Sequence, residues 1–268
     1  MAAANDVAPN APERAPEAPL FVVDGLTVHL GARRALDRAS LAIEPRRVTA
    51  LVGAPGCGKT ALLRALNRMN DPLPGARTEG SVRFEGRELY APDVDVQALR
   101  RRVGMVFRAP QLFPGTVFDN VAWGPRAAGE RRHAVLAEAV ERALARAGLA
   151  DELGPGAPDL PARALSQGQQ QLLCVARALA LGPAALLLDE PASALDPIAT
   201  ARLEDVLAGL RDEVTVVIVT HAAAQAARVS QVTAFFSEGR LVEAAGTSDL
   251  FTRPREQATQ DYLTGRYG

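Results

Sequence analysis

A glycine-rich segment between an apolar run and a helical pattern is the part of the sequence best suited to chemistry. It reads GAPGCGKT, Gly53 to Thr60, and lies between VTALV and ALLRALNRM. Glycines let backbone N–H groups turn inward around phosphate oxygens, and the start of the following helix adds a favourable dipole. Lys59 would carry positive charge to the β and γ phosphates, and the Thr60 hydroxyl would ligate Mg²⁺. We therefore predict a phosphate-binding P-loop; the alternative is a glycine-rich turn that matches by chance.

The predicted nucleotide contacts cover this whole segment and one residue beyond it. They are Gly53, Ala54, Pro55, Gly56, Cys57, Gly58, Lys59, Thr60 and Ala61. Cys57 lies near a helix N-terminus, which can lower the pKa of a thiol. Our hypothesis is that alkylation of Cys57 blocks nucleotide binding; the alternative is a small residue selected for fit.

Two adjacent acids end the apolar run AALLLDEP. Asp189 is placed to hold Mg²⁺ through its water shell, and Glu190 to polarise an attacking water. Burying unpaired carboxylates is costly, so two acids at the end of a hydrophobic strand rarely serve packing. The structural alternative is a strand that simply reaches solvent.

A histidine ends the second long apolar run, VTVVIVTH. His221 would emerge at the carboxyl end of a strand, where ligands of open α/β sheets bind. We interpret it as functional, against the alternative of an ordinary surface or core histidine. His29 and His133 are interpreted as structural.

The remaining pattern alternates strands and helices. FVVDGLTVHL, ASLAIEP, GSVRFEGREL and RRVGMVF have strand-like composition, and the two long apolar runs are typical of parallel strands buried on both faces. The segment from Gly129 to Gly148 has helical spacing, as does LSQGQQQLLCVARALAL, where Ser166 and Gln169 have capping-box spacing. We predict an α/β fold with a parallel sheet, an antiparallel β flank and a helical insert.

Four regions follow from this pattern. We expect a disordered Ala/Pro-rich tail at 1–19, a core with its β flank formed by 20–108 and 179–250, a helical subdomain at 109–178 and a C-terminal segment at 251–268.

Composition limits the class of protein. The net charge of −1 over 268 residues gives no general reason to expect a nucleic-acid partner. The 2 cysteines predict neither a disulfide framework nor a zinc site, which fits a reducing cytosol. No apolar run approaches the ~20 residues that span a bilayer, so any membrane role is expected to come through a partner.

Taken together, the motifs resemble an ATP-binding subunit of an ABC transporter. GAPGCGKT, LSQGQ, LLLDEP, SALD and TH occur in that family's order and spacing. The match is most like the ATPase subunit of bacterial phosphate importers, which LNRMNDPLPGARTEGSV, VFDNVAWG, SALDPIATARLEDVL and the ending DYLTGRYG resemble.

The resemblance implies a P-loop NTPase core with a helical signature subdomain, and ATP and Mg²⁺ as cofactors. Two copies would form a head-to-tail homodimer around two ATP molecules. The signature residues Ser166, Gly168 and Gln169 would meet the γ-phosphate bound by the other copy. Glu190 would activate water while His221 holds it in register. The partners would be transmembrane permease subunits and an extracytoplasmic solute-binding protein, with this chain peripheral at the cytoplasmic face of the cell membrane.

Four positions depart from the family pattern. Arg108 stands where the family carries a glutamine that touches Mg²⁺; arginine offers only donors, so it would pair with phosphate oxygens or with an acid on the membrane subunit. Leu30 replaces an aromatic that stacks on adenine, a loss of roughly 1–3 kcal/mol that predicts weaker ATP binding. Gln167 replaces a signature glycine, and Leu172 replaces an arginine.

Two functions from different classes are compatible with these residues. The first is a working ATPase that energises an importer, for inorganic phosphate or another anion. The second, motivated by Arg108 and Leu30, is a regulatory or degenerate subunit that binds nucleotide with little turnover. A DNA-repair or translation ABC protein fits poorly, because the chain has neither a long coiled-coil insert nor a basic excess.

Overall fold

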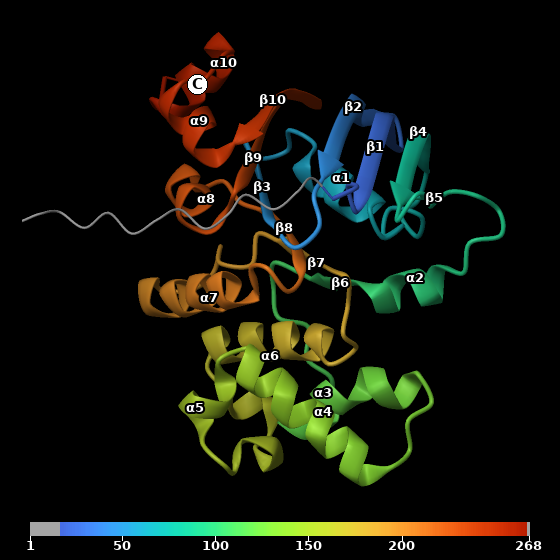
Figure 1. Cartoon of the computed structure of the whole chain (residues 1–268), viewed down its shortest axis with the longest axis vertical. Helices are drawn as coiled ribbons and strands as arrows, with labels where there is room; N and C mark the ends of the chain where they lie inside the picture. Colours follow the sequence, from blue (N-terminus) through green and yellow to red (C-terminus); the bar gives the residue numbers. More distant parts are fainter. Residues whose placement is uncertain (1–16, 267–268) are drawn as a thin grey trace, which may run out of the picture.

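Two β-sheets of different type form the upper part of the molecule, and a group of helices forms the lower part (Figure 1). The computed structural model describes residues 17–266. Positions 1–16 of the predicted tail and the last two residues lie outside the described residues.

The larger sheet has the strand order β10-β9-β3-β8-β7-β6. Neighbours from β9 to β6 run parallel, and β10 pairs antiparallel with β9. Every residue of β3, β7 and β8 is buried, which is why these strands read as continuous apolar runs. The bounds are Val48–Val52 for β3, Val103–Val106 for β6, Ala185–Asp189 for β7, Thr215–Val219 for β8, Val232–Ser237 for β9 and Arg240–Gly246 for β10.

The smaller sheet is antiparallel and has the order β2-β1-β4-β5. Alternation between buried and exposed positions is clearest in the second half of β2 and at the end of β4, as expected for a sheet with one face on a core. They are β1 Phe21–Leu30, β2 Arg33–Ile43, β4 Ala76–Phe84 and β5 Arg87–Glu88.

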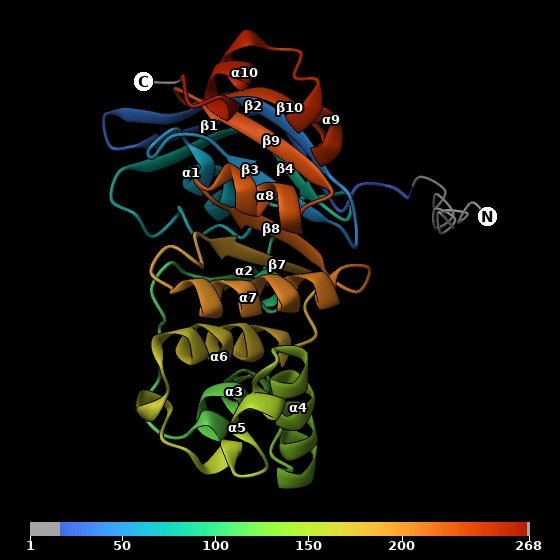
Figure 2. The same ribbon diagram turned by 90° about the vertical axis from the view of Figure 1, so that its left-hand side faces the viewer.

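Helices α3 to α6 follow β6 in sequence and lie at the end of the molecule opposite the antiparallel sheet (Figures 1 and 2). The α-helices are α1 Lys59–Ala65, α2 Val96–Arg102, α3 Val117–Ala127, α4 His133–Arg146, α5 Leu149–Leu153, α6 Gln167–Leu179, α7 Pro197–Leu210, α8 Ala223–Val229, α9 Thr247–Thr252 and α10 Gln257–Leu263. Two short 3₁₀ helices, Ala157–Asp159 and Ala162–Ala164, precede α6. No helix within residues 17–266 is long and apolar enough to cross a membrane. The predicted α/β fold, with its parallel sheet, antiparallel flank and helical signature subdomain, is confirmed.

Helix boundaries follow local side-chain hydrogen bonds. The helix expected from Gly129 begins at His133, because the Glu130 carboxylate accepts the N–H groups of Arg131 and Arg132 and holds a turn there. It ends before Gly148, whose φ of 69° suits a helix stop. The capping box predicted at Ser166 and Gln169 is present in both directions and fixes the start of α6.

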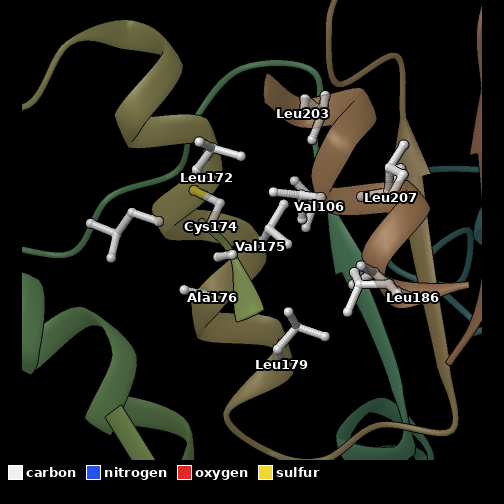
Figure 3. Close-up of a cluster of buried hydrophobic side chains, with 14 of the residues drawn as sticks. Val106, Leu172, Cys174, Val175, Ala176, Leu179, Leu186, Leu203 and Leu207 are labelled. Carbon is white, nitrogen blue, oxygen red and sulfur yellow. The ribbon is translucent and has the colours of Figure 1, made fainter. Parts of the chain in front are cut away.

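Helix α6 joins the helical region to the core. Its apolar side chains Leu172, Val175 and Leu179 face α7 and the edge of the larger sheet (Figure 3). Leu203 and Leu207 of α7 are fully buried in the same cluster. The position of α6, and therefore of the signature residues at its start, is set by this packing.

Shortening one of these side chains tests the contribution of the α6–α7 contact. We expect Leu207→Ala to lower the free energy of unfolding by roughly 2–5 kcal/mol, because the residue is fully buried and truncation leaves a cavity. Denaturant titration followed by circular dichroism measures this. Ile198→Ala is the control on the same helix: Ile198 is 70% exposed, so its truncation is expected to change stability by about 0.5 kcal/mol or less. Equal effects of the two substitutions would contradict this account of the core.

Candidate nucleotide-binding site

The P-loop segment connects the end of β3 to the start of α1, as predicted. Lys59 is buried, and its Nζ donates to the carbonyls of Gly53, at 2.7 Å, and Ala54, at 2.8 Å. The ammonium group is therefore held inside the curve of the loop. This is the position from which it can meet phosphate oxygens.

Two glycines of this loop are required by geometry. Gly53 has φ 140°, and a Cβ there would lie 2.1 Å from the carbonyl oxygen of Phe236. Gly58 has φ 104°, and a Cβ there would lie 2.6 Å from the carbonyl oxygen of Ala35. The loop is thus pressed against neighbouring backbone on one side, which fixes its curvature without side chains.

Cys57 is buried within the same loop. Its Sγ lies 3.4 Å from Lys59 Nζ, so a group attached to the sulfur would displace the lysine. That contact supports the hypothesis that alkylation interferes with nucleotide binding, and its 5% exposure implies slow labelling.

An oxygen pair suited to Mg²⁺ lies beside the P-loop. The Thr60 hydroxyl donates to Asp189 Oδ1 at 2.7 Å, which joins the start of α1 to the end of β7. Burial raises the pKa of Asp189, while the Thr60 hydrogen bond and the nearby Arg64 lower it. The residues fit a Mg²⁺ ion that would be held by the Thr60 hydroxyl and, through its water shell, by the Asp189 carboxylate, with its other ligands coming from phosphate and water. Within residues 17–266 there is no cluster of three or more acidic, histidine or cysteine ligands for a metal.

Glu190 follows directly after this pair and points toward His221. Its φ is 48°, in the left-handed region that residues with side chains rarely adopt. The turn is held by the Glu190 N–H, which donates to the carbonyl of Val219. Glu190 Oε2 lies 3.7 Å from His221 Nδ1. The structure therefore brings the predicted base and the predicted histidine together from the ends of two neighbouring strands.

Arg108 reaches the same carboxylate from the loop after β6. Its Nε donates to the Ser193 hydroxyl at 2.9 Å and lies 3.6 Å from Glu190 Oε2. Gln111, three residues further on, donates to the carbonyl of Ala109 in its own loop. Sequence reasoning identified Arg108 but not its partner Ser193, which belongs to the SALD segment 85 residues away.

Leu30 and Arg33 border the phosphate loop on the side of the antiparallel sheet. Both line a cavity of about 140 Å³ together with the P-loop residues Gly58, Lys59 and Thr60. The Arg33 guanidinium donates to the carbonyl of Gly56 at 2.6 Å. Arg33 was not identified from the sequence as a residue of this site. The only signal for it was a positively charged residue three positions after Leu30.

The signature residues lie apart from the P-loop in this chain. Helix α6 lies below α7 and the larger sheet, whereas α1 lies above α7, at about the level of β3, in both views (Figures 1 and 2). Ser166 and Gln167 are exposed at the start of α6. A Cβ on Gly168 would come 2.6 Å from that of Ala199, so this glycine permits the close approach of α6 and α7.

A second contact fixes the orientation of the signature segment. Gln169 Nε2 donates to Glu152 Oε1 at 2.8 Å, and Glu152 also pairs with Arg202 of α7. Leu172 is buried near this pair rather than taking part in it. An arginine is thus present next to the signature helix, but it comes from α7.

Comparison with known proteins identifies the family. Residues 36–193 match the family model described as ABC transporter, which is more than half of the chain. The chain belongs to this family. ABC ATPase domains bind ATP, generally with Mg²⁺, hydrolyse it and dimerise, so the predicted ATPase class is confirmed at that level.

Two solved ABC structures are similar over most of the chain. One is cbiO1 from Clostridium perfringens, part of the ABC transporter complex cbiONQ, with a TM-score of 0.77 and 26% identity over 92% of this chain and 96% of that chain. The other is a bacterial Atm1-family ABC exporter with ATP bound, with a TM-score of 0.76 and 26% identity. The match covers 97% of this chain but only 44% of the exporter chain. This chain therefore corresponds to less than half of that exporter.

Replacing Arg108 tests its effect on the ABC ATPase site. We expect Arg108→Gln to raise ATPase turnover or its coupling to transport, because the guanidinium pairs with the carboxylate predicted to activate water. An exposed ion pair contributes up to ~1 kcal/mol, which corresponds to a rise of up to about fivefold. Steady-state phosphate release measures turnover. Arg101→Gln, at an exposed arginine on α2, is the control. Unchanged or lower turnover and coupling would show that Arg108 is an adapted replacement for the family's glutamine.

Proposed function

We propose that this chain is the ATP-hydrolysing subunit of a membrane importer for inorganic phosphate. The observation that carries the ATPase part is the convergence of Thr60, Asp189, Glu190 and His221 at one edge of the larger sheet, next to buried Lys59. Each has the chemistry required for its role: a point charge for phosphate, an oxygen pair for Mg²⁺, and a carboxylate with an adjacent imidazole for the attacking water.

We further propose that the complete site forms between two copies. The helical signature subdomain, residues 109–178, would present Ser166, Gly168 and Gln169 to ATP on the P-loop of the other copy. The start of α6 is exposed and rigidly capped, which makes it suitable for an anion supplied by a partner. The separation of α6 from α1 within one chain supports this arrangement.

The proposed partners are transmembrane permease subunits and an extracytoplasmic solute-binding protein. The chain would lie peripherally at the cytoplasmic face of the membrane, and closure on ATP followed by opening would drive the permease. The proposal of phosphate as substrate rests on the sequence resemblance, because the transported molecule is selected by the partners. An importer ATPase for another anion is the alternative within this class.

A subunit with little turnover is the second candidate. The contact between Arg108 and Glu190 favours it, because the guanidinium lies beside the carboxylate oxygen that would otherwise be open to the attacking water. Leu30 favours it as well, since an aliphatic side chain gives less base stacking than an aromatic one.

Removing the carboxylate of Glu190 decides between these two candidates. We expect Glu190→Gln to reduce ATP hydrolysis by at least 100-fold while ATP binding is kept, because the amide cannot accept a proton from water. Phosphate release and equilibrium nucleotide binding measure the two properties on the same preparation. Wild-type activity no higher than that of Glu190→Gln would support the low-turnover subunit and contradict the working ATPase.

Phosphate as substrate is tested in cells. Deletion of the gene is expected to abolish high-affinity uptake of radiolabelled phosphate, because the permease loses its source of energy. Expression of the wild-type chain should restore uptake and Glu190→Gln should not. Membrane proteins that co-purify with the chain identify the permease. Unchanged high-affinity phosphate uptake in the deletion strain, together with a functional ATPase, would indicate another anion.

A further inference from the structure

The C-terminal helix α10 is attached to the core near the catalytic loops. Glu243 of β10 is largely buried and accepts the backbone N–H groups of Arg255, at 2.9 Å, and Glu256, at 3.2 Å. These bonds fix the start of α10, which lies against the edge strand β10. The end of α10, residues 261–263, is thereby brought close to the His221 loop from the far end of the chain.

Tyr262 of α10 packs on the strand beside the P-loop. Its ring stacks on that of Phe235, with centroids 4.8 Å apart and an interplanar angle of 27°. Phe235 is fully buried on β9 and is the register partner of Val52, the last residue of β3. Gly53, the first residue of the P-loop, follows immediately.

The hydroxyl of Tyr262 reaches the loop that carries His221. It donates to the His221 carbonyl oxygen at 3.2 Å. Burial raises the pKa of Tyr262, and a hydrogen bond from the Gly53 backbone opposes that rise. A phenol with a raised pKa keeps its proton near neutral pH and remains a donor to the carbonyl.

The His221 loop depends on a small number of such bonds. The Ala222 N–H donates to Thr220 Oγ1 at 3.0 Å, and the Thr220 N–H to the carbonyl of Leu51 at 3.1 Å. Helix α8 starts after Ala222, whose methyl side chain cannot cap it. The His221 side chain is 52% exposed, so packing alone does not fix the imidazole beside Glu190.

We propose that Tyr262 is a positioning residue for ATP hydrolysis: its hydroxyl holds the His221 backbone so that the imidazole stays beside Glu190. This proposal rests on the proposed role of His221 in hydrolysis. It also connects the C-terminal helix to the ATP site, since a shift of α10 would release or restrain the His221 loop.

Tyr262→Phe removes the hydroxyl and keeps the ring stack on Phe235. We expect kcat for ATP to fall about fivefold, the rate equivalent of one neutral hydrogen bond, with KM within about twofold of wild type. Tyr90→Phe is the matched control, because the Tyr90 hydroxyl also donates to a backbone carbonyl, that of Ala65 at 3.2 Å. It is expected to leave kcat unchanged.

Two readouts separate positioning from a general structural effect. In single-turnover assays, Tyr262→Phe should cost nothing further on a His221→Ala background, because both changes remove the same contribution. Amide hydrogen exchange should become faster at residues 220–222 in Tyr262→Phe and stay unchanged in Tyr90→Phe.

The outcomes distinguish this proposal from the proposed ATPase. Wild-type kcat in Tyr262→Phe, or a fivefold loss that persists without His221, would overturn the role of Tyr262 and leave the ATPase standing. If the wild-type chain hydrolyses no more ATP than Glu190→Gln, the ATPase proposal fails instead. In that case amide exchange at residues 220–222 still tests whether the Tyr262 hydroxyl restrains the His221 loop, and unchanged exchange would overturn that restraint.

Discussion

Val219 is the register partner of both Leu51 on β3 and Asp189 on β7. This parallel alignment makes three strands end at the same level, so the P-loop, the acidic pair and His221 all leave the sheet at one edge. Parallel strands require long crossover connections, which explains why residues at one site come from positions as distant as 59 and 221. Two hydrogen bonds extend the alignment past the strand ends: Glu190 donates to Val219, and Thr220 donates to Leu51.

The same alignment imposes an electrostatic cost. β7 is buried along its whole length, so its last residue, Asp189, loses most of its hydration and its pKa rises. Thr60 and Arg64, both on α1, compensate for part of this loss. A one-residue slip of β7 would reverse its side-chain directions and break both contacts. The register of the sheet therefore also determines the contacts that favour the ionised form of Asp189, the predicted Mg²⁺ ligand.

The sequence contained much of this arrangement because the relevant signals are local. Buried parallel strands are read as apolar runs, and the capping box at Ser166 follows from a spacing of three residues. The contacts missed from sequence join side chains to partners on other elements of the fold. Arg108 bonds to Ser193, Gln169 to Glu152, and Arg33 to Gly56, each from a different element. Neither periodicity nor composition shows in which direction such a side chain points, so its partner can be identified only in the folded chain. Local hydrogen bonds also explain the misplaced helix start, since the Glu130 carboxylate competes for the N–H groups that a helix beginning at Gly129 would use.

Glu190 stands between the Arg108 guanidinium and the His221 imidazole, and each of these is connected to a different outlying helix. Arg108 belongs to the loop after β6, whose Phe107 carbonyl accepts a hydrogen bond from Gln171 of α6 at 2.9 Å. His221 belongs to the loop after β8, and its backbone carbonyl accepts a hydrogen bond from the hydroxyl of Tyr262 on α10. A displacement of α6 would therefore move Arg108 relative to the Glu190 carboxylate, and a displacement of α10 would move His221. Since Arg108 Nε and His221 Nδ1 lie 3.6 Å and 3.7 Å from Glu190 Oε2, small movements of either helix would change the contacts that orient this carboxylate. Two hydrogen bonds thus connect the neighbours of Glu190 to helices that lie outside the P-loop and its strand.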